Sequence, residues 1–133
     1  MTRDLAQYVG ISDADGTTLI KILDPLVLSD DKAALYSLAE GAGGASLSSQ
    51  VVLNLENVRA LQSVMIATLI NFQKKVREQG GSLKICCIDP HVMRLFELTR
   101  MDQILDLRKD IPDAIQSFGS SSSGWMSRLF GSK

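Results

Sequence analysis

The chain has 133 residues, of which 45% are hydrophobic and 22% are charged, and its formal net charge is -1. A chain of this length and composition is expected to fold as one globular domain with a hydrophobic core of its own. The small net charge and the lack of a basic patch argue against a nucleic-acid-binding module, which normally carries a basic excess.

The chain is expected to begin with a β-hairpin. Residues 8–11 and 17–23 are apolar runs separated by a polar segment that contains Asp15 and Gly16. An Asp-Gly pair supplies the positive φ that a tight turn requires, so the two runs are predicted to pair as neighbouring strands. Residues 26–28 are interpreted as a further short extended piece.

A short helix and a flexible connector are expected next. Ser29, Asp30 and Asp31 offer a cap with acidic first-turn residues for a helix over residues 32–40. The segment 41–49 consists mostly of small residues and precedes a strand. A phosphate-binding loop ends in Gly-Lys-Ser/Thr and leads into a helix, so we interpret this segment as a helix stop and connector.

The centre of the chain joins a buried strand to a long amphipathic helix. Residues 51–58 form an alternating apolar run, which a short polar link follows. Ser63 stands where an N-cap is expected, because its hydroxyl is able to accept a hydrogen bond from a first-turn amide. Gly80 and Gly81 are predicted to stop the helix. Four apolar residues at helical spacing define its core face: Met65, Leu69, Phe72 and Val76.

The following strand carries both cysteines. Residues 82–88 form a near-continuous apolar run, which is typical of an interior strand covered on both faces. Cys86 and Cys87 are adjacent in this run, so their side chains are predicted to point to opposite faces. Because the chain has no further cysteine and no histidine cluster, we interpret them as buried or half-buried thiols of a reducing cytoplasm, in preference to a redox or metal-binding pair.

Two helices and a short strand are expected in the last third. Asp89 and Pro90 form a strong helix start. Residues 104–107 predict a short strand and residues 110–118 a final helix, at whose end we place the limit of the domain. The rest, 119–133, is predicted to be a disordered serine-rich linker and a short amphipathic tail, for which docking on a partner or a membrane surface is the alternative. The core face of the first helix should hold Val92, Leu95, Phe96 and Thr99.

The sequence offers little chemistry for catalysis or metal binding. His91 is the single histidine, and no Cys/His set has the spacing of zinc ligands, so no metal site and no cofactor are expected. Ser63 lies in no Gly-x-Ser-x-Gly elbow, which argues against a hydrolase. Phosphorylation of Ser63 would place an anion where helix amides and the helix dipole favour it, although a serine that only caps its helix is the simpler interpretation.

The sequence shows no targeting signal and no membrane-spanning segment. The first residues have no apolar core of a signal peptide, and no run reaches membrane-spanning length. We therefore expect a cytoplasmic protein without stable membrane insertion.

Four segments in this order resemble the STAS domains, a family best represented by bacterial anti-sigma factor antagonists. They are residues 51–58 (VVLNLENV), the helix that starts at Ser63, the Gly-Gly-Ser-Leu link at residues 80–83, and residues 90–99 (PHVMRLFELT). Arg100 follows where the family usually carries glycine. The resemblance extends from about Tyr8 to Phe118. It implies an α/β fold in a single domain over residues 1–118, with a mixed β-sheet, an N-terminal hairpin and about four helices packed against the sheet.

The resemblance also implies a function. Antagonists of this kind bind an anti-sigma factor that is a serine kinase, which phosphorylates a serine directly after an aspartate at the helix start. Ser63 takes the position of that serine, Gln62 that of the aspartate, and Met65 that of a usual glycine. We therefore expect a non-enzymatic regulatory protein that acts by partner switching, with Ser63 as its phosphorylation site. The residues expected to contact the partner are Asn54, Asn57, Gln62, Ser63 and Met65.

Two alternatives stay open. In the first, the chain is a STAS adaptor that is never phosphorylated and serves as a structural subunit of a signalling or transport assembly, which Gln62 and Met65 favour. In the second, it is an enzyme whose chemistry is built on scattered residues.

Overall fold

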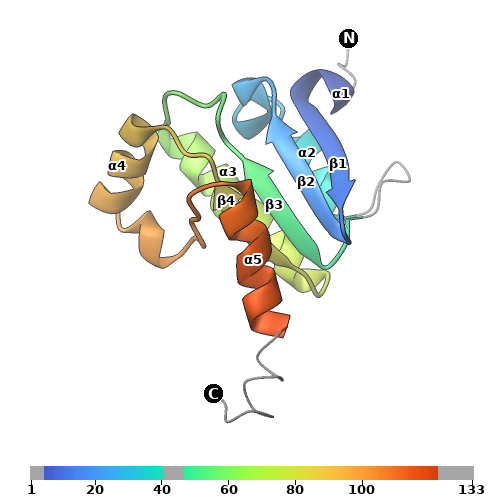
Figure 1. Cartoon of the computed structure of the whole chain (residues 1–133). Coiled ribbons are helices and arrows are strands. Elements are labelled where there is room, and N and C mark those ends of the chain that lie inside the picture. Colours follow the sequence, from blue (N-terminus) through green and yellow to red (C-terminus); the bar gives the residue numbers. More distant parts are fainter. Residues whose placement is uncertain (1–4, 41–46, 123–133) are drawn as a thin grey trace.

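A four-stranded sheet forms the centre of the molecule (Figure 1). The computed structural model describes residues 5–40 and 47–122, with side chains up to Phe118. In the sheet order, β1 and β2 pair antiparallel, whereas β2, β3 and β4 run parallel. The predicted α/β fold with a mixed sheet and an N-terminal hairpin is confirmed. The strands are β1 (Val9–Ala14), β2 (Thr17–Ile22), β3 (Gln50–Asn54) and β4 (Ser82–Cys86).

Helices cover both faces of the sheet (Figure 1). The helices α2 (Lys32–Ala39) and α3 (Ser63–Glu78) lie on one face together with the 3-10 turn η1 (Pro25–Leu28). The helix α5 (Ile111–Ser122) crosses the opposite face over β3 and β4. Shorter elements flank these layers: α1 (Leu5–Tyr8) before β1, and α4 (Pro90–Leu98) followed by η3 (Met101–Gln103) beyond β4.

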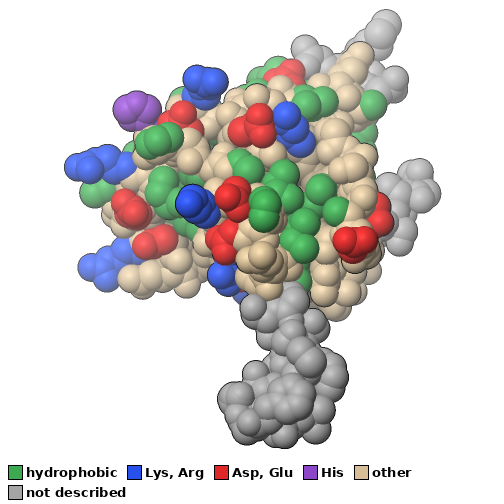
Figure 2. Space-filling view, in the orientation of Figure 1, with side chains coloured by type: hydrophobic (Ala, Val, Ile, Leu, Met, Phe, Trp, Pro, Cys, Tyr) green, Lys and Arg blue, Asp and Glu red, His purple; other side chains and the backbone are tan. Residues whose placement is uncertain are grey.

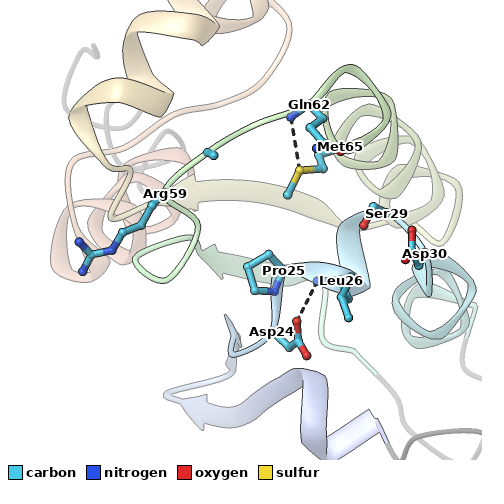
Figure 3. A pocket seen from close by; sticks show the side chains of 9 residues that line it. Asp24, Pro25, Leu26, Ser29, Asp30, Arg59, Gln62 and Met65 are labelled. Carbon is cyan, nitrogen blue, oxygen red and sulfur yellow. Dashed lines mark hydrogen bonds between the residues drawn. The ribbon is translucent and has the colours of Figure 1, made fainter.

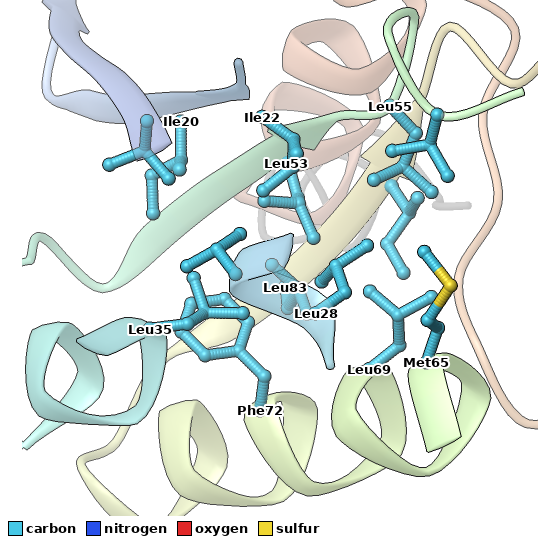
Figure 4. Close-up of a cluster of buried hydrophobic side chains, with 14 of the residues drawn as sticks. Ile20, Ile22, Leu28, Leu35, Leu53, Leu55, Met65, Leu69, Phe72 and Leu83 are labelled. Atoms are coloured by element: carbon cyan, nitrogen blue, oxygen red, sulfur yellow. The ribbon is translucent and has the colours of Figure 1, made fainter. Parts of the chain in front are cut away.

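The main hydrophobic core lies between the sheet and the α2–α3 layer (Figure 4). Strand alternation sends Leu53 of β3 toward Leu69 and Phe72 of α3, and all three are fully buried. The predicted core face of α3 is confirmed, because Met65 and Val76 are buried as well. A smaller cluster on the other face holds Val52, Cys86, Ala114 and Phe118 under α5.

Glycines and an aspartate make the expected sharp turns. Asp15 and Gly16 have φ of 53° and 86°, and they connect β1 to β2 as a two-residue hairpin loop. Positive φ at both central residues is the requirement of a type I′ turn, one of the two turns favoured in such loops. Gly80, with φ of 85°, lies just past α3 and ends it.

Two predictions about extended segments were wrong. Residues 26–28 lie in η1, because Pro25 suits the first position of a helical turn and the carboxylate of Asp24 accepts a hydrogen bond from the amide of Leu26 at 3.0 Å. Residues 104–107 form no strand; a single bridge pairs Leu107 with Ile85. It is held by the amide of Ile85 donating to the carbonyl of Asp106 at 2.8 Å.

The helix boundaries also differ in detail. Asp31 is the N-cap of α2, so the predicted acidic first-turn residues lie before the helix, and the carboxylate of Asp31 accepts a hydrogen bond from the hydroxyl of Tyr8. The predicted core face of α4 is confirmed only in part. Val92 and Phe96 are buried, whereas Leu95 and Thr99 are exposed, because only one narrow stripe of this helix meets the core.

The backbone of α5 stays helical to Ser122, so the prediction that this helix ends at residue 118 was wrong. The connector 41–46 and the tail 123–133 lie outside the described residues.

The β4 side of α5 contains a partly buried ion-pair cluster, in which Lys84 is buried and Asp106 and Arg108 are half-buried. The Nζ of Lys84 lies 2.7 Å from the carboxylate of Asp106 and 4.8 Å from the centre of the Phe118 ring. The Nε of Arg108 donates to the same carboxylate at 2.6 Å. Burial alone would raise the pKa of Asp106, but the hydrogen bonds from Arg108 and Lys84 outweigh it, so the pKa lies below its ordinary value.

The core assignment of α3 predicts a large effect for Leu69→Ala. Removing a fully buried leucine side chain loses its transfer free energy and leaves a cavity, so the free energy of unfolding should fall by about 2–5 kcal/mol. Val64→Ala on the exposed side of the same helix should change it by no more than about 0.5 kcal/mol. Urea titration measures both. Equal effects would contradict the assignment of the helix face.

The Asp106 cluster predicts a loss of stability in acid. Because the pKa of Asp106 is lower in the folded than in the unfolded chain, its contribution is present above the unfolded pKa of about 3.9 and is lost as pH falls through the folded value. Asp106→Asn should therefore destabilise the protein at neutral pH, and the difference should shrink below about pH 4. Urea unfolding across this range tests it, with Asp13→Asn on exposed β1 as control. A deficit that does not shrink in acid would refute this assignment.

Candidate partner-binding site

The segment that leaves β3 begins with a side-chain clamp. The Oδ1 of Asn54 accepts a hydrogen bond from the amide of Glu56 at 2.8 Å, and its Nδ2 donates to Oε1 of Glu56 at 3.0 Å. The Nζ of Lys21 on β2 lies 3.3 Å from the other carboxylate oxygen. The hydrogen bonds from Asn54 and Lys21 lower the pKa of Glu56.

Further hydrogen bonds tie the same segment to two neighbouring strands. The Nδ2 of Asn57 donates to the carbonyl of Ile22 at the end of β2, at 3.0 Å. The amide of Leu55 donates to the carbonyl of Cys86 at the end of β4, at 3.1 Å. The side chain of Val58 is fully buried. The segment between β3 and α3 is therefore held by both neighbouring strands, β2 and β4.

Gln62, and not Ser63, is the N-cap of α3. Gln62 has the extended backbone of a cap, with φ of -107° and ψ of 162°, and its carbonyl accepts from the amides of Met65 and Ile66 at 2.9 and 3.2 Å. Ser63 already belongs to the helix as its first residue. The prediction of a capping serine was wrong, because the chain turns into the helix one residue earlier than the serine suggested.

Met65 stabilises the start of α3 from the core side. Its Sδ accepts a hydrogen bond from the amide of Gln62 at 3.3 Å (Figure 3), and its side chain is 6% exposed in the main core. The bulk at this position therefore points into the protein. Of the residues predicted to contact a partner, Asn57, Gln62 and Ser63 are exposed, whereas Asn54 and Met65 are buried.

An open groove lies beside the helix start, between η1 and the segment that enters α3 (Figure 3). Its volume is about 590 Å³. Leu26 in the groove wall is 38% exposed, so apolar surface is available here. The η1 wall was not predicted from the sequence, although the Asp24-Pro25 pair signals a helical start there. The groove is lined by Asp24, Pro25, Leu26, Ser29, Asp30, Arg59, Ala60, Gln62 and Met65.

Other surface features are less suited to ligand chemistry. Within residues 5–40 and 47–122, no group of three or more His, Cys, Asp or Glu side chains is placed to hold a metal ion. In the same part of the chain, no helix combines the length and apolar character needed to cross a membrane. His91 is exposed on α4. Hydrophobic side chains show between charged ones on the α5 face (Figure 2), where Leu19, Val52 and Ile111 help to line a shallow hollow of about 210 Å³.

The corrected helix start makes a prediction about caps. Ser63→Ala should change the free energy of unfolding by no more than about 0.5 kcal/mol, because an exposed first-turn serine is being truncated. Asp89→Ala should cost about 0.5–2 kcal/mol, because the Asp89 carboxylate caps α4 by accepting from the amide of His91 at 2.8 Å. Chemical denaturation of the two variants measures this contrast. A Ser63→Ala loss as large as that of Asp89→Ala would restore Ser63 as a cap.

Comparison with solved structures gives the same fold in several proteins. A Thermotoga maritima protein provisionally described as an anti-sigma factor antagonist superposes with a TM-score of 0.67 and 19% identity, covering 85% of this chain and 96% of that one. An anti-sigma factor antagonist (STAS) domain protein of Planctomyces limnophilus gives 0.64 and 17%, covering 84% and 97%. A chain from the stressosome, a signal integration and transduction hub, gives 0.66 and 14%, covering 85% and 98%.

The family pattern explains one unusual backbone position. Arg100 has φ of 62°, in the left-handed region where glycine is least strained, and it stands where the family usually carries glycine. The model of the STAS domain family matches residues 11–114, which is most of the chain and includes all four strands except the first two residues of β1. The chain therefore belongs to the STAS domain family.

Proposed function

We propose that this chain is a regulatory protein-interaction domain of the anti-sigma-antagonist type, which binds a protein partner at the start of α3. The observation that carries the proposal is the exposure of Ser63 as the first helical residue, directly after Gln62, which lines the open groove. This surface needs neither a cofactor nor a catalytic group to act.

The composition of the surface suits a reversible protein contact. Leu26 in the groove and Val64 next to Ser63 on the first turn of α3 both expose apolar area, while Gln62 and Arg59 add polar groups to the groove lining. Protein interfaces combine apolar and polar groups of this kind. Because the segment before α3 is anchored to β2 and β4, little conformational entropy should be lost when a partner binds.

Phosphorylation of Ser63 would change the charge of this surface. Two carboxylates and one guanidinium give the groove lining one net negative charge. A phosphate would add about 1.5 to 2 negative charges. The first-turn amides and the dipole of α3 would stabilise that anion, so the fold should tolerate it while the surface offered to the partner changes. By the family resemblance, the proposed partner is an anti-sigma factor with serine kinase activity.

A second candidate function is a STAS adaptor that is never phosphorylated. It is favoured by Gln62 and Met65, which replace the aspartate and glycine of the family pattern. The amide of Gln62 bonds to the sulfur of Met65, a side-chain contact that glycine at this position could not make. The start of α3 is therefore held by an interaction that the family pattern does not provide. The chain would then serve as a structural subunit of a signalling or transport assembly.

The phosphorylation proposal predicts that Ser63→Asp, an imperfect mimic, weakens partner binding with little effect on the melting temperature. The matched control is Ser82→Asp, which adds the same charge at an exposed serine on the amino end of β4, at the opposite end of the sheet. Partners captured from the native cell are identified first. Their affinity for the wild type, for Ser63→Asp and for Ser82→Asp is then measured by calorimetry. Mass spectrometry after incubation with a captured kinase and ATP locates the phosphate.

The outcomes separate the two candidates. Capture of an ATP-dependent serine kinase that modifies Ser63, with loss of affinity only in the Ser63→Asp chain, supports partner switching. Capture of a stable scaffold complex with Ser63 unmodified, and with equal affinity for all three chains, supports the adaptor instead.

A further inference from the structure

The two cysteines lie together at the end of β4. Their sulfur atoms are 3.3 Å apart, although neighbouring strand residues point to opposite faces. The prediction of opposite faces was wrong because the strand ends at Cys86 and the backbone of Cys87 turns left-handed, with φ of 60°. The turn brings the Cys87 sulfur back beside that of Cys86.

The two thiols differ in their surroundings. Cys86 is fully buried in the cluster under α5, with Val52, Ala114 and Phe118. Burial raises the pKa of the Cys86 thiol, and the contact with the Cys87 thiol raises it further. Cys87 is half-buried, so a small reagent reaches it first. One thiol is accessible and the second lies within contact distance behind it.

We infer that Cys86 and Cys87 form a dithiol modification site, which a hydroperoxide oxidises to a disulfide between the two adjacent residues. This inference goes beyond the proposed function and does not depend on it, because it involves neither Ser63 nor a protein partner.

The oxidation takes two steps, in which atoms and electrons balance. The sulfur of Cys87 attacks the outer oxygen of the hydroperoxide, the O–O bond breaks, and the departing alkoxide takes the thiol proton to give an alcohol and a sulfenic acid. The sulfur of Cys86 then attacks the Cys87 sulfur, and the hydroxyl of the sulfenic acid leaves with the Cys86 proton as water. The two thiols lose two electrons and the hydroperoxide gains them.

Chain geometry makes this disulfide easily reduced. Neighbouring Cα atoms across a trans peptide are about 3.8 Å apart. That separation is shorter than the roughly 4.4–6.8 Å of ordinary disulfides, and such deviations store strain and make the bond more reducible. A strained, partly accessible disulfide belongs to the labile class, so the modification should reverse with a mild dithiol reductant.

Closing the ring would also move the peptide group between the cysteines. The carbonyl of Cys86 accepts a hydrogen bond from the amide of Leu55, and the amide of Cys87 donates to the carbonyl of Lys109 at 3.3 Å. Rotation of this peptide plane would weaken both bonds. The first bond holds the segment that leaves β3, and the second holds the residues that precede α5. Oxidation is therefore coupled to two segments of the fold.

The test uses the full folded chain and hydrogen peroxide, without a partner. After oxidation the protein is denatured, alkylated with iodoacetamide and weighed by mass spectrometry. We expect loss of both alkylation sites, a mass lower by two hydrogen atoms, and full recovery with dithiothreitol. Amide hydrogen exchange at Leu55 and Cys87 should be faster in the oxidised chain. Ser63→Ala should oxidise as the wild type does, which separates this result from the proposed function.

Single variants show whether the pair acts together. Cys86→Ala should leave Cys87 with added oxygen and no internal disulfide, and Cys87→Ala should leave the buried Cys86 unmodified at the same dose; circular dichroism checks that both are folded. The inference is overturned if the wild type keeps both thiols, gains oxygen on Cys87 alone, or forms disulfide-linked dimers. Unchanged exchange at Leu55 and Cys87 in an oxidised chain would overturn the coupling.

Discussion

The structure depends on β3, which lies between two parallel neighbours and is buried on both faces. Leu53 fills the core beneath α3, while Val52 on the opposite side supports α5. Its register is fixed by β2 and β4 at once, since Ile20, Leu53 and Ile85 pair across the three strands. Side chains alternate between the two faces of a strand. A shift of the β3 register by one residue would therefore turn Asn54 toward the main core and Leu53 toward the opposite face of the sheet.

The same register determines what β3 delivers to its carboxyl end. Asn54, the last residue of the strand, points away from the α3 side and holds Glu56 in the clamp with Lys21. Asn57 then bonds to β2 and Leu55 to β4. The chain consequently enters α3 at a fixed place, with Gln62 as the cap and Ser63 exposed beside the groove. The Cys86–Cys87 peptide belongs to this network through Leu55, so the candidate partner site and the dithiol site share one support.

The sequence predicted the features that follow from local periodicity and turn chemistry. The spacing of Leu69 and Phe72, the Asp15-Gly16 hairpin and the Asp89-Pro90 helix start are all local signals, and the structure confirms them. The errors arose where tertiary contacts decide. At the start of α3 the amide of the cap Gln62 bonds to the Met65 sulfur, which takes the capping-box position usually held by Glu or Gln, so the usual residue preferences do not reveal it. The left-handed turn at Cys87 is a three-dimensional feature as well, since its amide bonds to Lys109, far along the chain.

We propose that a rigid helix start presents Ser63 to a partner and that a phosphate there would change the surface without changing the fold. The most direct measurement is a comparison of backbone amide NMR spectra of the unmodified chain and the chain phosphorylated at Ser63. Shift changes confined to the first turn of α3 and the residues lining the groove are expected. Shift changes that spread to Leu53, Phe72 and Ile85 in the core would refute this proposal, because they would show that the phosphate reorganises the fold.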